Sequence, residues 1–131
     1  MQEQGRTHKL VIDGRLPNLN DYTKACRTNH HAGNNMKKKE EQRIIGHIYT
    51  QLNGVHINTP VYMKYKWYEP NKRRDHDNVS SFGRKVIQDA LVKAEVLKDD
   101  GWKYVLGASD EYYVCKEYPR IEVEIVEQEE N

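Results

Sequence analysis

The chain has 131 residues, enough for one domain with its own hydrophobic core, and we expect a single domain over residues 1–131. Its formal net charge of +1 excludes a generally basic coat for nucleic acid, so any site for a polyanion must be local. Only 37% of the residues are hydrophobic and mean hydropathy is −0.99, which leaves room for a partner subunit to complete part of the core. The charges are segregated: residues 64–74 carry five basic residues and one Glu, whereas residues 117–131 carry six Glu and one Arg.

Cysteine usage and the first residues bear on the cellular compartment. Cys26 and Cys115 lie far apart without a CxxC spacing, which argues against a zinc module and favours a reducing intracellular compartment. Residues 1–6 are polar and lack the apolar segment of a secretory leader, and no stretch approaches a membrane span. We therefore expect a cytoplasmic protein with no membrane association.

The first third of the chain combines a short strand with a polar segment. Residues 8–13 predict a strand closed by Gly14, and residues 15–35, rich in Asn, Gly, Pro and Thr, predict a long loop. Asn20 and Lys24 in this segment are candidate DNA contacts, because such side chains can hydrogen-bond phosphates. A solvated polar loop is the alternative interpretation of each residue.

The middle of the chain shows two clear periodicities. Between residues 36 and 52, apolar residues recur at three- and four-residue steps and predict an amphipathic helix, ended by Asn53-Gly54. From Val61 to Tyr68, apolar and polar residues alternate, which predicts a strand with one buried face.

A second helix and several strands complete the expected fold. Apolar residues between Val79 and Leu97 fall in one half of a helical wheel, and the helix is expected to begin near Asn78 or Ser80. Three short strands are expected at residues 102–106, 111–116 and 120–126, with the chain ends, about 1–7 and 127–131, frayed. These patterns predict an α+β fold in which one mixed β-sheet packs against two main helices.

The segment between the predicted strand and the second helix has the most informative chemistry. Asp75 and Asp77 are two residues apart, so in an extended segment their carboxylates share one face and can converge on a hard cation, while His76 points the other way. The neighbouring basic and amide residues suit a phosphate backbone. Oxygen ligands beside phosphate contacts are what metal-assisted phosphodiester hydrolysis requires. The candidate DNA contacts here are Lys72, Arg73, Arg74 and Asn78.

Other kinds of site have less support. An EF-hand loop that starts at Asp75 is excluded, because its positions 5 and 12 would both be valine. A nucleophilic triad is unsupported, since no Ser or Cys has the required turn context. His30 and His31 could bind a soft metal, but adjacent histidines in a polar segment are more often bystanders.

The combination of several motifs is more specific than any one of them. The motifs are Lys72-Arg73-Arg74-Asp75-His76-Asp77-Asn78, Lys85 followed by Asp89-Ala90-Leu91, and Asp99-Asp100, with a weaker match at Pro17-Asn18-Leu19-Asn20. Over this set the chain resembles the RusA-type Holliday junction resolvases, particularly their prophage-encoded branch. The spacing from Asp77-Asn78 to Asp89 is four residues longer than in the best-known member, which is about one helical turn.

The resemblance implies a function and a set of site residues. Members of that family are small dimeric endonucleases that use Mg²⁺ to make paired nicks across a four-way DNA junction. The resemblance implies that Asp75, Asp77 and Asp100 bind Mg²⁺, with Mn²⁺ as a substitute, and that Lys85 assists catalysis. Asp89 would be a supporting or purely structural residue. It further implies a homodimer, no nucleotide cofactor, and the cytoplasm of a bacterial host, with a phage or prophage origin.

Two other functions stay open from the sequence. The chain could be a non-catalytic DNA-binding or architectural phage protein in which the acidic cluster holds a structural cation. It could also be a nuclease that prefers flaps or other branched DNA.

Overall fold

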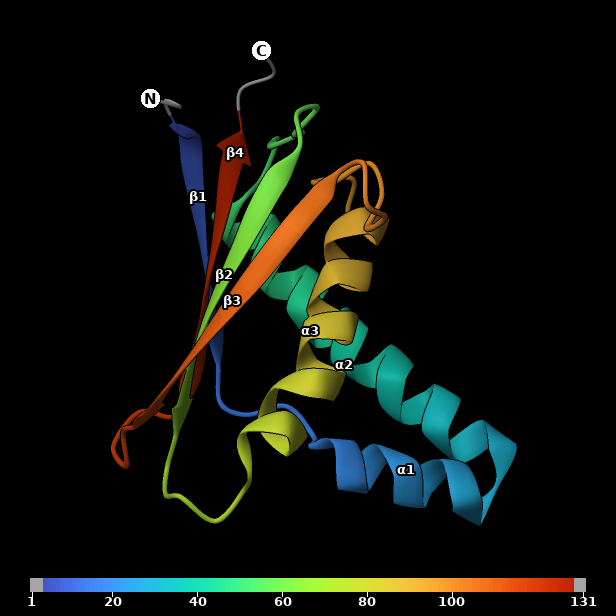
Figure 1. Cartoon of the computed structure of the whole chain (residues 1–131). Helices are drawn as coiled ribbons and strands as arrows, with labels where there is room; N and C mark the ends of the chain where they lie inside the picture. Colours follow the sequence, from blue (N-terminus) through green and yellow to red (C-terminus); the bar gives the residue numbers. More distant parts are fainter. Residues whose placement is uncertain (1–3, 129–131) are drawn as a thin grey trace.

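A computed structural model describes residues 4–128, which form one four-stranded sheet with three helices on one of its faces (Figure 1). The strand order is β1-β4-β2-β3; β4 is antiparallel to both β1 and β2, whereas β2 and β3 are parallel. The predicted α+β class and mixed sheet in a single domain are confirmed. In chain order the elements are β1 (Gln4–Asp13), α1 (Leu19–Thr28), α2 (His30–Gln51), β2 (Val61–Glu69), α3 (His76–Lys93), β3 (Val105–Val114) and β4 (Arg120–Gln128).

Strand β2 supplies the central row of the core. Its residues alternate between buried and partly exposed positions, as the sequence predicts, and the buried Trp67 packs against Gly83 of α3. Trp67 pairs with Ile121 and Tyr65 with Val123 of β4, so the buried rows of the two strands coincide. The buried residues of β2 are Val61, Met63, Tyr65 and Trp67.

Helix α3 packs closely on β2 because one of its residues is glycine. A Cβ atom at Gly83 would lie 2.7 Å from the Trp67 ring, so only glycine lets the helix approach the strand at this point. The indole N–H of Trp67 donates to Asp110 on β3 at 2.9 Å, and Arg84 of α3 contacts the same carboxylate at 3.1 Å. These contacts fix α3 over β2 and β3.

The connection from β2 to β3 determines where a site can form. Parallel neighbouring strands need a crossover, and α3 provides it. The loop that leaves β2 and the end of β3 therefore lie at the same end of the sheet, next to the first turn of α3 (Figure 1). Among residues 4–128, no helix is long and apolar enough to cross a membrane.

The prediction of a loop over residues 15–35 is wrong, because this segment contains α1 and the start of α2. Asn18 begins α1 with a capping box: its side chain accepts from the N–H of Asp21 at 2.7 Å, and Asp21 accepts from the N–H of Asn18 at 3.2 Å. Asn29 caps α2 by accepting from the N–H groups of His31 and Ala32. Helix α1 has no fully buried residue, but Leu19, Tyr22 and Cys26 recur at helical spacing along it, a signal that the loop prediction overlooked.

Element boundaries differ from expectation elsewhere too. Helix α3 begins at His76 rather than at Asn78 or Ser80, and the three short strands expected after residue 101 are two longer ones, β3 and β4. Residues 4–7 and 127–128, which we expected to fray, lie in β1 and β4. The rest of the expected frayed ends lies outside the described residues.

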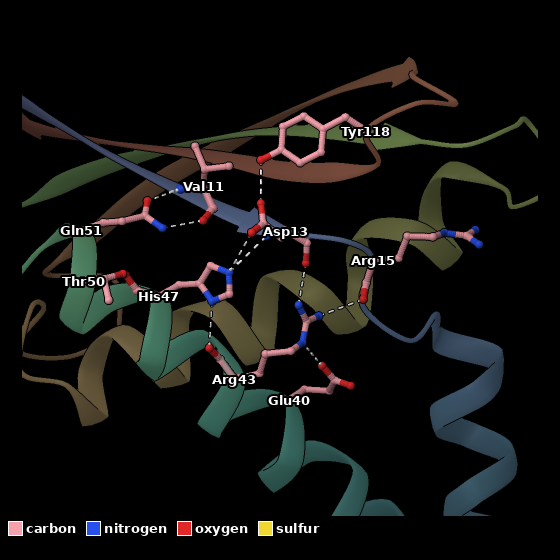
Figure 2. A network of polar contacts seen from close by, with 9 residues as sticks. All are labelled: Val11, Asp13, Arg15, Glu40, Arg43, His47, Thr50, Gln51 and Tyr118. Carbon is pink, nitrogen blue, oxygen red and sulfur yellow. Dashed lines mark hydrogen bonds and ion pairs between the residues drawn. The ribbon is translucent and has the colours of Figure 1, made fainter.

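The outer edge of β1 is covered by side chains of α2 (Figure 2). The Gln51 amide accepts from the N–H of Val11 at 2.7 Å and donates to its carbonyl at 2.8 Å. Arg43 donates to the carbonyl of Asp13 at 2.7 Å, and a ring nitrogen of His47 lies 3.3 Å from the Asp13 amide nitrogen and accepts its hydrogen. These contacts satisfy backbone groups that would otherwise face solvent at the edge of a sheet.

Candidate active site

A pocket of about 770 Å³ lies at the end of the sheet where β2 ends and α3 begins. Four charged residues of the predicted motif at residues 72–78 line it, namely Lys72, Arg74, Asp75 and Asp77. The remaining lining residues are Glu69, Asn71, His76, Val79, Tyr112, Tyr113 and Val114. The pocket therefore unites the loop after β2, the first turn of α3 and the last residues of β3.

Asp75 and Asp77 line this pocket from the start of α3. Asp75 is the N-cap residue with an extended backbone, but its side chain makes no capping hydrogen bond, and Asp77 lies in the first turn. Within residues 4–128, neither carboxylate makes a side-chain hydrogen bond or an ion pair. The positive end of the helix dipole favours negative charge at this position. The two carboxylates are thus close in the chain and available to a ligand in the pocket.

His76 lies in the same pocket, contrary to the expectation that it points away from the two aspartates. The expectation assumed an extended backbone, whereas His76 is the first residue of α3. Its ring stacks on Tyr112 of β3, with 3.7 Å between the centroids and 3° between the planes. The Tyr112 hydroxyl in turn donates to Ser80 at 2.9 Å. This contact joins the first turn of α3 to the end of β3.

The basic residues of the motif have different environments. Arg74 is half-buried and donates to the carbonyl of Leu16 at 3.0 Å, and its guanidinium lies 3.6 Å from Asp21. It therefore fixes the segment before α1 against the pocket. Lys72 is exposed and lines the pocket, whereas exposed Arg73 lies outside the lining set. Lys72 is the basic residue best placed to meet an anion in the pocket.

Glu69, the last residue of β2, is a pocket residue that the sequence did not single out. Arg15 binds its carboxylate at two points, 2.6 and 3.2 Å, and Arg74 lies 4.0 Å away. Such two-point contacts orient a carboxylate strongly and neutralise it. In the sequence, the only sign that Glu69 belongs to the site is its position shortly before the charged motif.

Lys85 on α3 and Asp100 in the turn after α3 form a second group. The Lys85 ammonium nitrogen lies 3.3 Å from Asp100 and 3.4 Å from Asp89, and Asp89 also contacts Lys37 at 2.8 Å. The charge of Asp89, followed by the hydrogen bond to Asp100, raises the pKa of Lys85 above its ordinary value. Burial acts to raise the pKa of Asp89, but Lys37 and Lys85 outweigh it and hold that pKa below its ordinary value.

The three predicted metal ligands do not meet within one chain. Lys85 follows Asp77 by eight residues on α3, which corresponds to about 12 Å along the helix axis. Asp100 contacts Lys85 and so belongs with the second group. Over the described range 4–128, no cluster of three or more His, Cys, Asp or Glu side chains could hold a metal ion. The structure brings Asp75 together with Asp77, and Asp100 together with Lys85.

The other predicted DNA contacts lie outside the aspartate pocket. Asn20 and Lys24 are exposed on α1 and line a separate hollow of about 530 Å³, together with Thr23, Arg27 and Thr28. Asn78, in the first turn of α3, is not among the lining residues of either hollow.

Comparison with known proteins identifies the family. No curated protein sequence matches the chain. The family sequence model described as endodeoxyribonuclease RusA matches residues 17–126, which is most of the chain and includes both groups of site residues. The resemblance seen in the motifs is confirmed, and the chain belongs to the RusA family of junction-resolving endodeoxyribonucleases.

Proposed function

We propose that this protein is a Mg²⁺-dependent endonuclease that resolves four-way DNA junctions by paired phosphodiester hydrolysis. The observation that carries the proposal is the pocket in which Asp75 and Asp77 lie with Lys72 at the positive end of α3. Carboxylates suit a hard cation and the lysine suits the phosphate, so one pocket provides both requirements of the reaction. The prophage origin, predicted from the resemblance, and the cytoplasmic location, predicted first from cysteine usage and the polar first residues, stay predictions.

The pocket fits a hard divalent cation. Mg²⁺ in nucleases and polymerases is commonly held by one or two carboxylates and by the phosphate of the substrate, while it keeps several waters. Asp75 and Asp77 provide two such carboxylates, and Mn²⁺ has the same preference for oxygen ligands. When bound, the cation would supply charge neutralisation at the scissile phosphate and an activated water.

The remaining residues of the motif would hold the DNA. Lys72 would contact the phosphate that enters the pocket, and exposed Arg73 with Asn78 would contact the backbone beside it. Such contacts position DNA without reading its sequence. Asn20 and Lys24 on α1 would extend this surface along the DNA, which is consistent with their exposure and the nearby Arg27.

Lys85 and Asp100 would act from a position further along α3. We assign Lys85 to the stabilisation of charge on the leaving oxygen or a phosphate oxygen. In the free protein its ammonium group holds the carboxylate of Asp100. Use of Asp100 as a third ligand would therefore require this ion pair to open and the turn after α3 to move toward Asp77. An incoming phosphate that attracts Lys85 provides a reason for the ion pair to open.

A homodimer would follow from the need for two cuts. Paired nicks across a symmetric junction require two active sites related by a two-fold axis. Within residues 4–128 the outer edge of β3 has no strand partner, and exposed Leu106, Tyr113 and Val114 lie along this strand. We propose that two copies pair along β3.

Sedimentation tests this interface. The wild type should sediment as a dimer, whereas a variant with both Leu106→Lys and Val114→Lys should sediment as a monomer. A monomeric wild type would exclude this interface.

Cleavage of a synthetic four-way junction tests the proposed reaction directly. The purified protein should introduce symmetric nicks with Mg²⁺ and none with EDTA, and it should leave a duplex of the same sequence uncut. Faster cleavage of a flap than of a four-way junction would instead support a nuclease that prefers flaps or other branched DNA.

One observation favours the non-catalytic alternative, a DNA-binding protein with a structural cation. This observation is that residues 4–128 of a single chain lack a cluster of three acidic or histidine ligands. Junction binding without cleavage, in Mg²⁺ and in Mn²⁺, would support this alternative over the nuclease.

A further inference from the structure

Trp102 is almost entirely exposed. Its relative exposure is 97%, whereas the other tryptophan, Trp67, is 2% exposed in the core. Tryptophan has the largest apolar surface of any side chain and is mostly buried in folded proteins. A tryptophan that makes almost no contact with its own chain is therefore available to contact something else.

The backbone around Trp102 is fixed rather than loose. The carbonyl of Gly101 accepts from the N–H of Tyr104 at 3.1 Å and from that of Val105 at 2.9 Å, which closes a turn over Trp102. On the other side, the N–H of Asp100 donates to the side chain of Asp99 at 2.7 Å. The indole is presented to solvent by an ordered turn, so little conformational entropy would be lost when it binds a partner.

The residues around Trp102 are charged. Its neighbours in sequence are Asp100, Gly101, Lys103 and Tyr104, and both Lys98 and Lys103 are exposed. The turn also carries Asp100, which contacts Lys85 on α3. The core of a protein–protein interface is depleted of charged residues, so this composition does not favour a protein partner. On the N-terminal side Asp99 and Asp100 lie closer to Trp102 than Lys98 does, so Lys103 is its nearest cation in sequence. An aromatic ring beside this exposed lysine suits a ligand that has both a flat ring and a phosphate.

We propose that Trp102 stacks on a nucleobase that is exposed where strands of the bound DNA exchange. This assignment rests on the proposed nuclease function and adds a specificity-determining residue to it. Bases inside a duplex are covered on both faces by their neighbours, whereas a base at a branch point or strand end can offer one face to an aromatic side chain. Trp102 would thus favour branched DNA over duplex, while Lys103 contacts the adjoining phosphate.

Fluorescence of the native protein can isolate this contact. Because Trp67 is buried, quenching by acrylamide in solution reports mainly on Trp102. In EDTA, where no cleavage is expected, addition of a four-way junction should change the tryptophan emission and protect it from acrylamide. Junction binding seen by gel shift, with no change in emission or in acrylamide quenching, would overturn the proposal and leave the nuclease function standing. No junction binding at all would overturn both.

Variants separate stacking from a general effect of the turn. Trp102→Ala should weaken junction binding about 5-fold or more, as expected for the loss of one stacked base, while duplex binding changes little. Trp102→Phe should restore most of the affinity and remove the fluorescence change. Tyr49→Ala, which removes another exposed aromatic ring, on α2, is the matched control and should bind like the wild type. Equal losses on junction and duplex, or a tryptophan emission that depends on protein concentration without DNA, would contradict base stacking.

Discussion

Lys85 and Asp100 are 15 positions apart in the sequence, yet their ammonium nitrogen and carboxylate oxygen lie 3.3 Å apart. The contact folds the turn after α3 back onto the exposed side of that helix. Asp100 is the predicted metal ligand that lies outside the pocket of Asp75 and Asp77, and in this structure its carboxylate pairs with Lys85 instead. The first two predictions concern this ion pair and the residue beside it.

Lys85→Met should lower the rate of junction cleavage about 100-fold while it leaves junction binding nearly unchanged. The variant loses a donor that stabilises charge in the transition state, and losses of this kind commonly reach that size. Single-turnover cleavage with saturating protein measures the chemical step. Lys38→Met, which removes an exposed lysine on α2, should cleave at the wild-type rate. A Lys85→Met variant as fast as the wild type would remove this residue from the reaction.

Asp89→Asn should change both the pH profile of cleavage and the pH dependence of stability. Asp89 is the main reason that the pKa of Lys85 is raised. Without it, Lys85 should lose its proton at a lower pH, so the activity of the variant should start to fall at a lower pH than that of the wild type.

The effect on stability follows from the pKa of Asp89 itself. Burial acts to raise this pKa, but Lys37 and Lys85 outweigh burial and lower it, so the ion pairs of Asp89 stabilise the fold at neutral pH. That contribution is lost as the pH falls through the lowered pKa. Urea unfolding should therefore show a destabilised variant at pH 7 and a smaller difference below about pH 4.

Asp75→Asn and Asp77→Asn should each abolish Mg²⁺-dependent cleavage, with a loss of at least about 100-fold, because a neutral amide is a much weaker ligand for a hard cation. Junction binding measured in EDTA should stay the same or improve, since a negative charge near the phosphate is removed. Glu117→Gln changes the charge equally at an exposed position outside the pocket and serves as the control. Retained nicking by Asp77→Asn would exclude this carboxylate as a ligand.

Two glycines should respond in opposite ways to the same substitution. Gly83→Ala would place a methyl group 2.7 Å from the Trp67 ring, so we expect a loss of about 1–3 kcal/mol in the free energy of unfolding. Gly46→Ala on α2 meets open space and should gain about 0.5–1 kcal/mol through improved helix propensity. Urea denaturation gives both values. Equal stability of Gly83→Ala and the wild type would show that α3 can move away from β2 without cost.

Burial decided which parts of the fold could be predicted from the sequence. The alternation of Val61 to Trp67 and the apolar stripe of α3 reflect one buried face each, so both elements were found. Helix α1 buries no residue completely. The capping box of Asn18 and Asp21 and the helical spacing of Leu19 and Tyr22 were both in the sequence, but the Asn, Gly, Pro and Thr content of the segment favoured a loop. Strand β3 was divided in two because Gly107, Ser109 and Asp110 interrupt its apolar pattern.

The candidate site was predictable as residue types and only partly as geometry. Asp75 and Asp77 do line one pocket, but not because of an extended i, i+2 spacing: Asp75 caps α3, Asp77 is in its first turn, and His76 lies beside them. Asp100 lies against Lys85 because the turn after α3 folds it back onto that helix. The sequence pattern did not predict this turn, and so it could not place Asp100. The salt bridge of Glu69 with Arg15 joins residues distant in sequence and has no local signature.

The Gln51 amide makes the two backbone hydrogen bonds at Val11 that a neighbouring strand would otherwise make. It therefore limits how the protein can aggregate or assemble along β1. Over residues 4–128 it leaves only the outer edge of β3 without a partner, so the pairing of two copies along β3 proposed above would leave no free strand edge for a third copy. Growth by strand addition would then stop at a pair, and a fibre built from folded molecules would first require α2 to leave its place on β1.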